Sequence, residues 1–382
     1  MPPDDITPFA VDVPDEVLDD LRARLHRTRW PDGAPGDPWE YGADLAYVRD
    51  VCATWADAFD WRAAEERINR FDQFTTEIDG QNVHFIHARS AEENALPLLM
   101  THGWPDSIVS FLPVIDPLRD PAAHGGDATD AFHVVCPSLP GYTWSGPTTE
   151  RGWDTRRVAE AWAALMGRLG YSRYGAQGGD WGSLVTTQLA EVDAGHLAGI
   201  HLNMPVCGPP PDGGEMTEEE AESFARVSDY LENGAGYADI QGTKPQTLAY
   251  GLTDSPAGLA GWILEKYHAW TDHDGDLETA VDRDALLTNL TAYWVTGTIN
   301  SSTRLYYESK KTGRFGPTGS RIRVPTAVAL YPEEILTAPR SWLEAAFDLQ
   351  RVAEMPRGGH FAALEEPELF VDDLREAFRL FR

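Results

Sequence analysis

The stretch YGAQGGDWGSLVTTQ, residues 174–188, sets three glycines around Asp180 and continues into an apolar run that is compatible with a helix. A sharp turn from a strand into a helix forces its central residue into strained backbone geometry and requires very small neighbours, because side chains would collide there. Gly178 and Gly182 stand at the two flanking positions, and aspartate tolerates such a conformation better than most residues do. On its own the stretch predicts only a turn, since an aspartate in a turn is common.

The composition of the 382 residues bounds the class of protein. Hydrophobic residues make up 42% of the chain and aromatic residues 10%, which is ample for a large buried core. The formal net charge of −30 argues against binding to nucleic acids or to anionic membranes, because both need clustered lysine and arginine. The three cysteines are widely spaced, so they predict neither a disulfide framework nor a zinc cluster and favour a reducing cytoplasm.

Several other kinds of motif are absent from the sequence. The N-terminal segment MPPDDITPFAVDVPDE has neither a basic stretch nor an apolar core, so we expect no signal peptide or membrane anchor. The segment TDHDGDLE, residues 271–278, is acidic like a calcium loop, but counting from Asp272 puts Leu277 where that loop requires glycine. The chain contains neither dinucleotide-binding glycines nor an H-E-x-x-H pair, and we expect no metal and no organic cofactor.

Apolar periodicity predicts helices in the first part of the chain. A stripe with a period near four begins after Pro14 and is expected to stop before Pro31. A second stripe of helical period runs from Leu45 to Phe59. The period then changes to two around Asp79-Gly80, which predicts a β-hairpin.

The next segments alternate between strand and helix. ALPLLMTHGWP (95–105) and AFHVVCPSLPGY (131–142) are short apolar runs that end in turn residues, as buried parallel strands do. TRRVAEAWAALMGRLG (155–170) has one apolar helical face. The alternation predicts an α/β sheet.

This α/β rhythm is interrupted once. A junction rich in proline, glycine and acidic residues covers residues 209–222, and the pattern is then mainly helical to about residue 318. Strand character returns at RIRVPTAVALYP (321–332), and the chain closes with an amphipathic helix in ELFVDDLREAFRLF. We therefore expect a sheet domain that is interrupted by a helical insert and then resumed.

Other motifs give the Asp180 turn a chemical context. MTHGWPDS ends an apolar strand, and the loop that follows lies where backbone N–H groups can face the turn. Two donors, from Trp104 and Trp181, would stabilise an oxyanion at that point. We interpret His102 in the same loop as a residue that structures the turn rather than as a base.

An acid and a base follow Asp180 later in the chain. YPEEI places Glu333 and Glu334 at the carboxyl end of a strand, and PRGGHFAALEEP places His360 in a loop before the last helix. Nucleophile, acid and base then occur in the chain order of an α/β-hydrolase.

Together these motifs resemble the microsomal type of epoxide hydrolase within the α/β-hydrolase superfamily. The resemblance covers nearly the whole chain, through LRARLHRTRWPD, HGWP, GGDWG, LLTNLTAYWVTGTINSSTRLYYE, PEEILTAPRSW and RGGHFAALEEPELF. It implies an α/β-hydrolase fold, which has a mostly parallel central sheet, flanking helices, an inserted helical cap and an N-terminal helical meander. The expected division is 1–75 for the meander, 76–207 for the first part of the core, 208–318 for the cap and 319–382 for the second part of the core.

The resemblance also implies roles for particular residues. The family's carboxylate nucleophile corresponds to Asp180, its base to His360 and its acid to Glu334, with Glu333 as the fallback. The family uses two cap tyrosines to hold the epoxide oxygen.

By motif these tyrosines are Tyr237 in AGYADIQGTKP and Tyr306 in SSTRLYYES, with Tyr307 as the rival of the latter. A neutral phenol can donate a proton to the opening ring without adding a permanent charge.

The implied reaction converts an epoxide and water into a vicinal diol through an alkyl ester of the aspartate. The implied substrate is a hydrophobic or aromatic epoxide from detoxification or from secondary-metabolite (antibiotic) biosynthesis, and the expected location is the cytoplasm. A homodimer is left open.

Three alternatives remain at this point. A haloalkane dehalogenase shares the aspartate nucleophile, although paired cap tyrosines favour an epoxide oxygen. A serine esterase is disfavoured because Ser183 lies past the apex of the turn. A catalytically silent binding protein of the same fold would have no reason to keep all five site residues.

Overall fold

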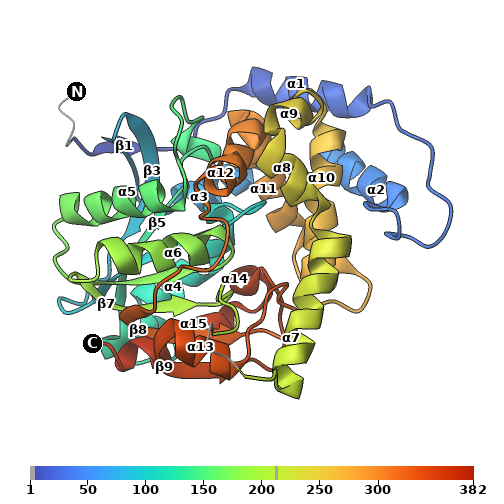
Figure 1. The fold of residues 1–382 in the computed structure, drawn as a ribbon. Helices are drawn as coiled ribbons and strands as arrows, with labels where there is room; N and C mark the ends of the chain where they lie inside the picture. The colour runs from blue at the N-terminus through green and yellow to red at the C-terminus, as the bar shows by residue number, and fades with distance from the viewer. Residues whose placement is uncertain (1–4, 211–213) are drawn as a thin grey trace.

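The computed structural model describes residues 5–210 and 214–382, and its centre is a nine-stranded sheet in the order β1-β2-β3-β5-β4-β6-β7-β8-β9 (Figure 1). Strands β4 to β9 pair in parallel, whereas β1, β2 and β3 form antiparallel pairs at one edge of the sheet. The strands are β1 (Thr7–Phe9), β2 (Gln73–Ile78), β3 (Gln81–Ala88), β4 (Leu96–Thr101), β5 (Phe132–Pro137), β6 (Tyr174–Gly178), β7 (Leu197–Leu202), β8 (Ile322–Leu330) and β9 (Phe347–Glu354). This topology confirms the predicted α/β-hydrolase fold.

Helices cover both faces of the sheet and bury an apolar layer on each. On one face α5 (Thr155–Arg168) and α6 (Trp181–Val192) pack through side chains such as Trp162 and Leu189. On the other face α4 (Leu112–Arg119) and α15 (Pro367–Arg379) enclose a second apolar cluster. The strands between them are buried on both sides, so their residues are apolar almost without alternation.

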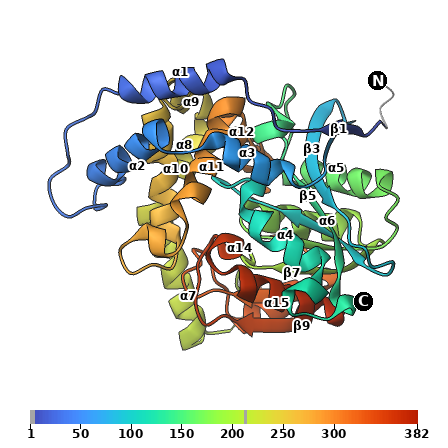
Figure 2. The same ribbon diagram turned by 180° about the vertical axis from the view of Figure 1, so that it is seen from behind.

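Most of the remaining helices lie together at one end of the sheet (Figures 1 and 2). Three come from the N-terminal segment: α1 (Asp15–His26), α2 (Leu45–Asp57) and α3 (Trp61–Asn69). The others lie between β7 and β8: α7 (Glu218–Asp229), the π-helical turn η5 (Tyr230–Gly234), α8 (Gly236–Thr243), α9 (Pro245–Asp254), α10 (Pro256–Trp270), α11 (Arg283–Thr296) and α12 (Ile299–Thr312). Two short helices, α13 (Arg340–Ala346) and α14 (Ala362–Glu365), follow β8 and β9.

Local details agree with the sequence predictions with small differences. Asp79 and Gly80 both have positive φ, 51° and 74°, and form the two-residue turn of the β2–β3 hairpin. Helix α1 ends at His26, before Pro31, and Phe59 lies two residues beyond the end of α2. The predicted junction at 209–222 includes residues 211–213, which lie outside the described residues, and α7 then begins with a capping box at Thr217.

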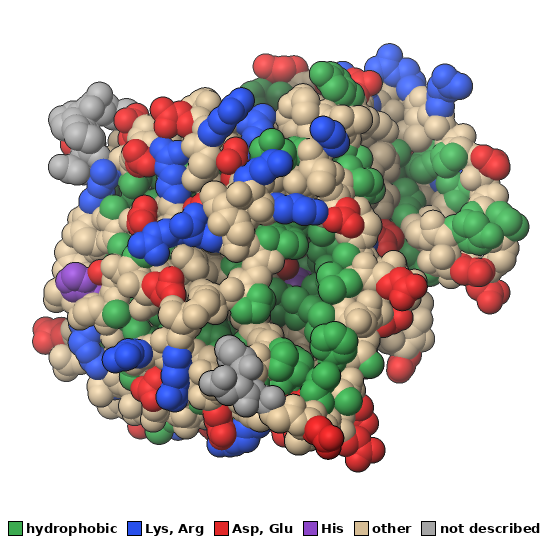
Figure 3. Space-filling view, viewed as in Figure 1, with side chains coloured by type: hydrophobic (Ala, Val, Ile, Leu, Met, Phe, Trp, Pro, Cys, Tyr) green, Lys and Arg blue, Asp and Glu red, His purple; other side chains and the backbone are tan. Residues whose placement is uncertain are grey.

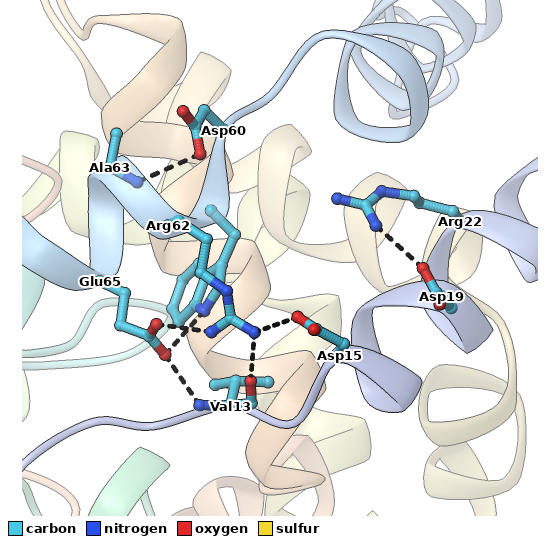
Figure 4. Close-up of polar contacts among 9 residues, drawn as sticks. Val13, Asp15, Asp19, Arg22, Asp60, Arg62, Ala63 and Glu65 are labelled. Atoms are coloured by element: carbon cyan, nitrogen blue, oxygen red, sulfur yellow. Dashed lines mark hydrogen bonds and ion pairs between the residues drawn. The ribbon is translucent and has the colours of Figure 1, made fainter.

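The chain before α1 is tied to α3 by a cluster of polar contacts (Figure 4). The buried Glu65 carboxylate accepts the Val13 N–H at 2.8 Å, and the Arg62 guanidinium donates to the Val13 carbonyl at 2.7 Å. The same guanidinium pairs with Glu65 and Asp15. The contacts give the buried carboxylate partners, and without partners its burial would cost free energy. They also attach the segment just before α1 to α3. Helices α1 and α2 in turn pack against α10.

The helices that the structure describes are each too short or too polar to cross a bilayer.

The turn between β6 and α6 has the geometry that its glycines indicate. Asp180 has φ 49° and ψ −127°, a strained conformation for a residue with a side chain. A Cβ at Gly178 would lie 2.1 Å from the Gly182 carbonyl oxygen, and a Cβ at Gly182 would lie 1.9 Å from the Thr101 carbonyl oxygen. Both glycines are therefore required by close backbone approach, and they hold α6 against the end of β4.

We predict that Gly182→Ala destabilises the protein by about 1–3 kcal/mol or more, because the new methyl group must displace backbone atoms. The matched control is Gly167→Ala in α5, where nothing lies within 4 Å of the added Cβ. The control should raise stability by about 0.5–1 kcal/mol. Urea unfolding of both variants measures the difference. Equal stability of the two variants would contradict the close contact at Thr101.

Candidate active site

Three loops bring Asp180, Glu334 and His360 together at the carboxyl edge of the parallel strands. Asp180 follows β6, Glu334 follows β8 and His360 follows β9. The His360 Nδ1 lies 2.6 Å from Glu334 Oε1, and its Nε2 lies 3.5 Å from Asp180 Oδ2. Carboxyl ends of parallel strands meet at one edge, so residues far apart in sequence converge there. The imidazole is buried, whereas 13% of the Asp180 side chain stays exposed.

The structure places Glu334, and not Glu333, against the imidazole. Glu334 is buried, and its Oε1 also accepts the Ile335 N–H at 2.8 Å. Glu333 is exposed, and its backbone N–H donates to the Gly358 carbonyl at 3.2 Å.

Burial alone would lower the pKa of His360, but the carboxylates of Glu334 and Asp180 outweigh it. Together they raise the pKa well above its ordinary value of 6.5. The free site therefore favours an imidazolium between two acids.

One backbone N–H group contacts the Asp180 carboxylate, at the position that the sequence predicts for Trp104. The Trp104 N–H donates to Asp180 Oδ1 at 2.7 Å. Trp181 is the first residue of α6, so its N–H is one of the amides without a partner inside the helix. The first helical turn also presents the positive end of the helix dipole to Asp180.

His102 holds the loop that carries Trp104. Its Nδ1 lies 2.9 Å from the Gly103 carbonyl oxygen, and its Nε2 accepts the Leu139 N–H at 3.1 Å. Burial lowers the pKa of His102 to about 4, so the ring is neutral and both its nitrogens are used within the loop. This agrees with a structural role and leaves no free nitrogen for base chemistry.

Two cap tyrosines lie over the Trp104 ring. Tyr237 comes from α8 and stacks on Trp104 with centroids 5.3 Å apart, while Tyr306 comes from α12 and meets the same ring edge-on at 5.8 Å. The two phenol rings are 5.9 Å apart, and Trp181 lies 4.6 Å from Tyr306. Tyr307 instead lies partly exposed beside Lys311. The structure thus groups Tyr306 with the other site residues.

Both phenols are kept in the protonated form. Burial is the main cause that raises the pKa of Tyr237 and of Tyr306 well above 10, and the Asp180 charge adds to it. Protonated hydroxyls that face a carboxylate can donate to an oxygen atom bound between them.

Several site residues could not be recognised from sequence. Asp106 and Gln177 line, with His360, a cavity of about 30 Å³ behind Asp180, which exceeds the ~10–15 Å³ that one water needs. Burial raises the pKa of Asp106 to about 7. Asp106 stands in the HGWPDS motif, but only its burial distinguishes it from an ordinary loop acid.

Glu365 organises the loop around His360. Its carboxylate accepts the N–H groups of Asp272, Gly359 and Phe361 at 2.8–2.9 Å. The acidic segment 271–278 therefore has a structural function near its start, where Asp272 also accepts the Gly358 N–H. Within the described residues, no group of three or more acidic, histidine or cysteine side chains is arranged to hold a metal.

Comparisons with known proteins concern the whole chain rather than single site residues. A family model described as the epoxide hydrolase N terminus matches residues 6–111, and one for the alpha/beta hydrolase fold matches residues 97–233. Epoxide hydrolase 1 of Sus scrofa is 37% identical over 399 aligned residues, covering 97% of this chain and 88% of that protein. A Stigmatella aurantiaca protein provisionally named an epoxide hydrolase is 46% identical over 379 residues, with coverage of 99% and 86%. The structure of Aspergillus niger epoxide hydrolase superposes with a TM-score of 0.88 at 31% identity, covering 99% of this chain and 97% of that one.

We predict that Glu334→Gln lowers the pKa of His360, because it removes one of the two carboxylates that raise it. In the wild type, a raised folded-state pKa adds stability that is complete below the unfolded value of about 6.5 and is lost as pH rises through the folded pKa. NMR titration of the imidazole measures the shift. Glu333→Gln is the matched control and should leave the His360 titration unchanged; the reverse pattern would mean that Glu334 is not the partner.

Proposed function

Because the chain belongs to the epoxide hydrolases of the microsomal type, we propose that it opens its substrate through a covalent ester with Asp180, which water then hydrolyses. The enzyme is an epoxide hydrolase, a hydrolase that acts on ether bonds. The observation that carries the proposed mechanism is the position of Asp180: one carboxylate oxygen accepts the Trp104 N–H and the other lies 3.5 Å from His360.

Ring opening is the first step. A carboxylate is already ionised at neutral pH, so Asp180 can attack an epoxide carbon directly. The new bond joins a carboxylate oxygen to that carbon while the ring C–O bond breaks. The developing alkoxide receives a hydrogen bond from both cap hydroxyls and a proton from one of them, and the result is an alkyl ester of Asp180.

Ester formation prepares the second step by changing the charge around the imidazole. Esterified Asp180 carries no negative charge, so one of the two causes that raise the pKa of His360 disappears. The imidazolium then gives its proton to solvent and becomes a neutral base, with Glu334 still at its Nδ1. The tyrosinate left by ring opening takes one proton from solvent, so the charges balance. The cavity that Asp180 and His360 both line offers a place from which water would reach the base and the ester carbonyl.

Hydrolysis completes the cycle. Water gives a proton to His360 Nε2, and its oxygen attacks the carboxyl carbon of the ester. The oxyanion that forms is stabilised by the N–H groups of Trp104 and Trp181, and removal of one such donor elsewhere slows acyl transfer by about 10²–10³-fold. Collapse releases the vicinal diol and restores the Asp180 carboxylate.

The proposed substrate is a hydrophobic or aromatic epoxide. Aromatic rings lie close to Asp180. The Phe315 ring contacts the rings of Trp181 and Tyr306 and is itself exposed to solvent. Figure 3 shows apolar side chains around a hollow on this face of the molecule. The exposed apolar residues Phe224 and Leu231, at α7 and η5, extend the apolar surface.

We further propose detoxification or secondary metabolism as the setting, the cytoplasm as the location, and water and a small epoxide as the reactants. The three cysteines are free thiols, which suits a reducing compartment. A panel of aryl, alkyl and polycyclic epoxides, with chiral analysis of the diols, would distinguish the substrate classes.

The ester predicts the origin of the product oxygen. In a single turnover with enzyme in excess in ¹⁸O-water, the new hydroxyl should carry unlabelled oxygen from Asp180. His360→Gln should trap the ester, seen as an added substrate mass on the intact protein. Asp180→Ala should lose activity by about 10⁴–10⁶-fold, as loss of a nucleophile does elsewhere. Label in the first-turnover product would show direct attack by water and exclude the ester.

The two neighbouring tyrosines of α12 give a second test. We expect Tyr306→Phe to slow ring opening by about 10–100-fold, the effect of losing a hydrogen bond to a charged oxygen. Tyr307→Phe removes the same atom one residue away and should change the rate by less than about twofold. Stopped-flow kinetics of ester formation measures both. A larger effect for Tyr307→Phe would reverse the assignment.

A further inference from the structure

The two cap tyrosines of the active site have unequal surroundings. The Tyr306 hydroxyl is buried and has no hydrogen-bond partner among the described residues. The Tyr237 hydroxyl lies 2.9 Å from the hydroxyl of a third tyrosine, Tyr230. Tyr230 belongs to the π-helical turn η5, just before α8. Such turns are uncommon and often occur at functional sites.

The direction of the hydrogen bond between Tyr230 and Tyr237 is fixed once Tyr237 donates to a substrate. A phenol has one proton to donate, and Tyr237 needs its own for the epoxide oxygen. While Tyr237 donates there, the contact with Tyr230 can persist only if the Tyr230 O–H donates to the Tyr237 oxygen. The Tyr230 hydroxyl then donates to the Tyr237 oxygen, which becomes negative when Tyr237 loses its proton.

The unequal burial of the two phenols favours proton transfer from Tyr230 to Tyr237. Tyr237 is 6% exposed, whereas Tyr230 is partly exposed at the edge of the cap. Negative charge is less costly where water can solvate it, so the anion is better placed on Tyr230 than on Tyr237. Burial raises the pKa of both phenols, and the bond between them lowers that of Tyr230.

The charges that face the pair partly balance one another. Asp180 opposes a phenolate on either tyrosine, and Glu265 and Glu334 add to this at Tyr230. Against them, the Lys266 ammonium lies 4.5 Å from the centre of the Tyr237 ring, and Lys266 is itself 6% exposed. It also pairs with Glu265 at 2.5 Å. A buried cation at this distance favours a transient anion on the ring.

We propose that Tyr230 is a positioning residue that makes Tyr237, rather than Tyr306, the proton donor in ring opening; this rests on the function proposed above. The epoxide C–O bond breaks, and its oxygen takes the proton of Tyr237. Tyr237 takes the proton of Tyr230, and the Tyr230 phenolate takes one from solvent water. The proton that the His360 imidazolium gives to solvent after ester formation balances this uptake. Ester hydrolysis then returns a proton to His360, so the full cycle consumes only epoxide and water.

The experiment separates ring opening from hydrolysis in the His360→Gln background, where the ester accumulates. Enzyme in excess is mixed with an aryl epoxide that the wild type turns over, and ester formation is followed by quenched mass spectrometry. Adding Tyr230→Phe should slow ring opening by about tenfold or more, as expected for loss of one charge-assisted hydrogen bond. In the background with intact His360, Tyr230→Phe should leave the rate of ester hydrolysis unchanged. Tyr250→Phe, at an exposed cap tyrosine, is the matched control.

Two readouts distinguish this role from a merely structural one. Ring opening in H₂O/D₂O mixtures should give a curved proton inventory with Tyr230 present, because two protons move, and a linear one in Tyr230→Phe. A double-mutant cycle should show that Tyr230→Phe has no further effect once Tyr237 is phenylalanine. A linear inventory for the parent enzyme, or an unchanged ring-opening rate in Tyr230→Phe, would overturn the proposal. Absence of any ester in His360→Gln would instead overturn the proposed function on which it rests.

Discussion

The strained turn at Asp180 is the constraint on which the site depends. Its backbone is stable only because Gly178 and Gly182 allow α6, β6 and the end of β4 to approach within the space of a missing methyl group. That approach puts the carboxylate at the edge of the sheet, in reach of the Trp104 N–H and of His360. Every later step of the proposed reaction uses this position, so the glycines that make the turn possible also place the carboxylate where it would react.

The charges around that turn couple the two proposed steps, because ring opening changes the pKa of the imidazole that would act in hydrolysis. In the free enzyme one imidazole lies between two carboxylates, and the phenols above it are fully protonated. In the proposed reaction, attack on the ring removes the negative charge of Asp180, which lowers the pKa of the imidazole. Under this proposal, ester formation itself prepares His360 to act as a base.

Much of the fold and of the site could be predicted because particular residues carry strong local constraints. Short motifs indicate the Asp79-Gly80 hairpin and the Asp180 turn. They also indicate the chain order of Asp180, Glu334 and His360. Tyr230, Lys266 and Glu365 could not be predicted in the same way. Their contacts join segments that are distant in sequence or depend on a helical turn of unusual pitch, and no composition or spacing signals these. The resemblance to the family favoured Glu334 over Glu333, whereas nothing in the sequence itself indicates that Glu334 is buried and Glu333 exposed.

The order of the strands along the chain affects how the site assembles during synthesis of the protein. Asp180 and its turn leave the ribosome long before β8 and β9, which complete the sheet and bring Glu334 and His360 with them. Pairings across such separations form late, because distant segments must first meet. A nascent chain that contains Asp180 but not yet His360 would lack the base of the proposed hydrolysis step, so it could not complete a turnover until β8, β9 and the His360 loop have been made.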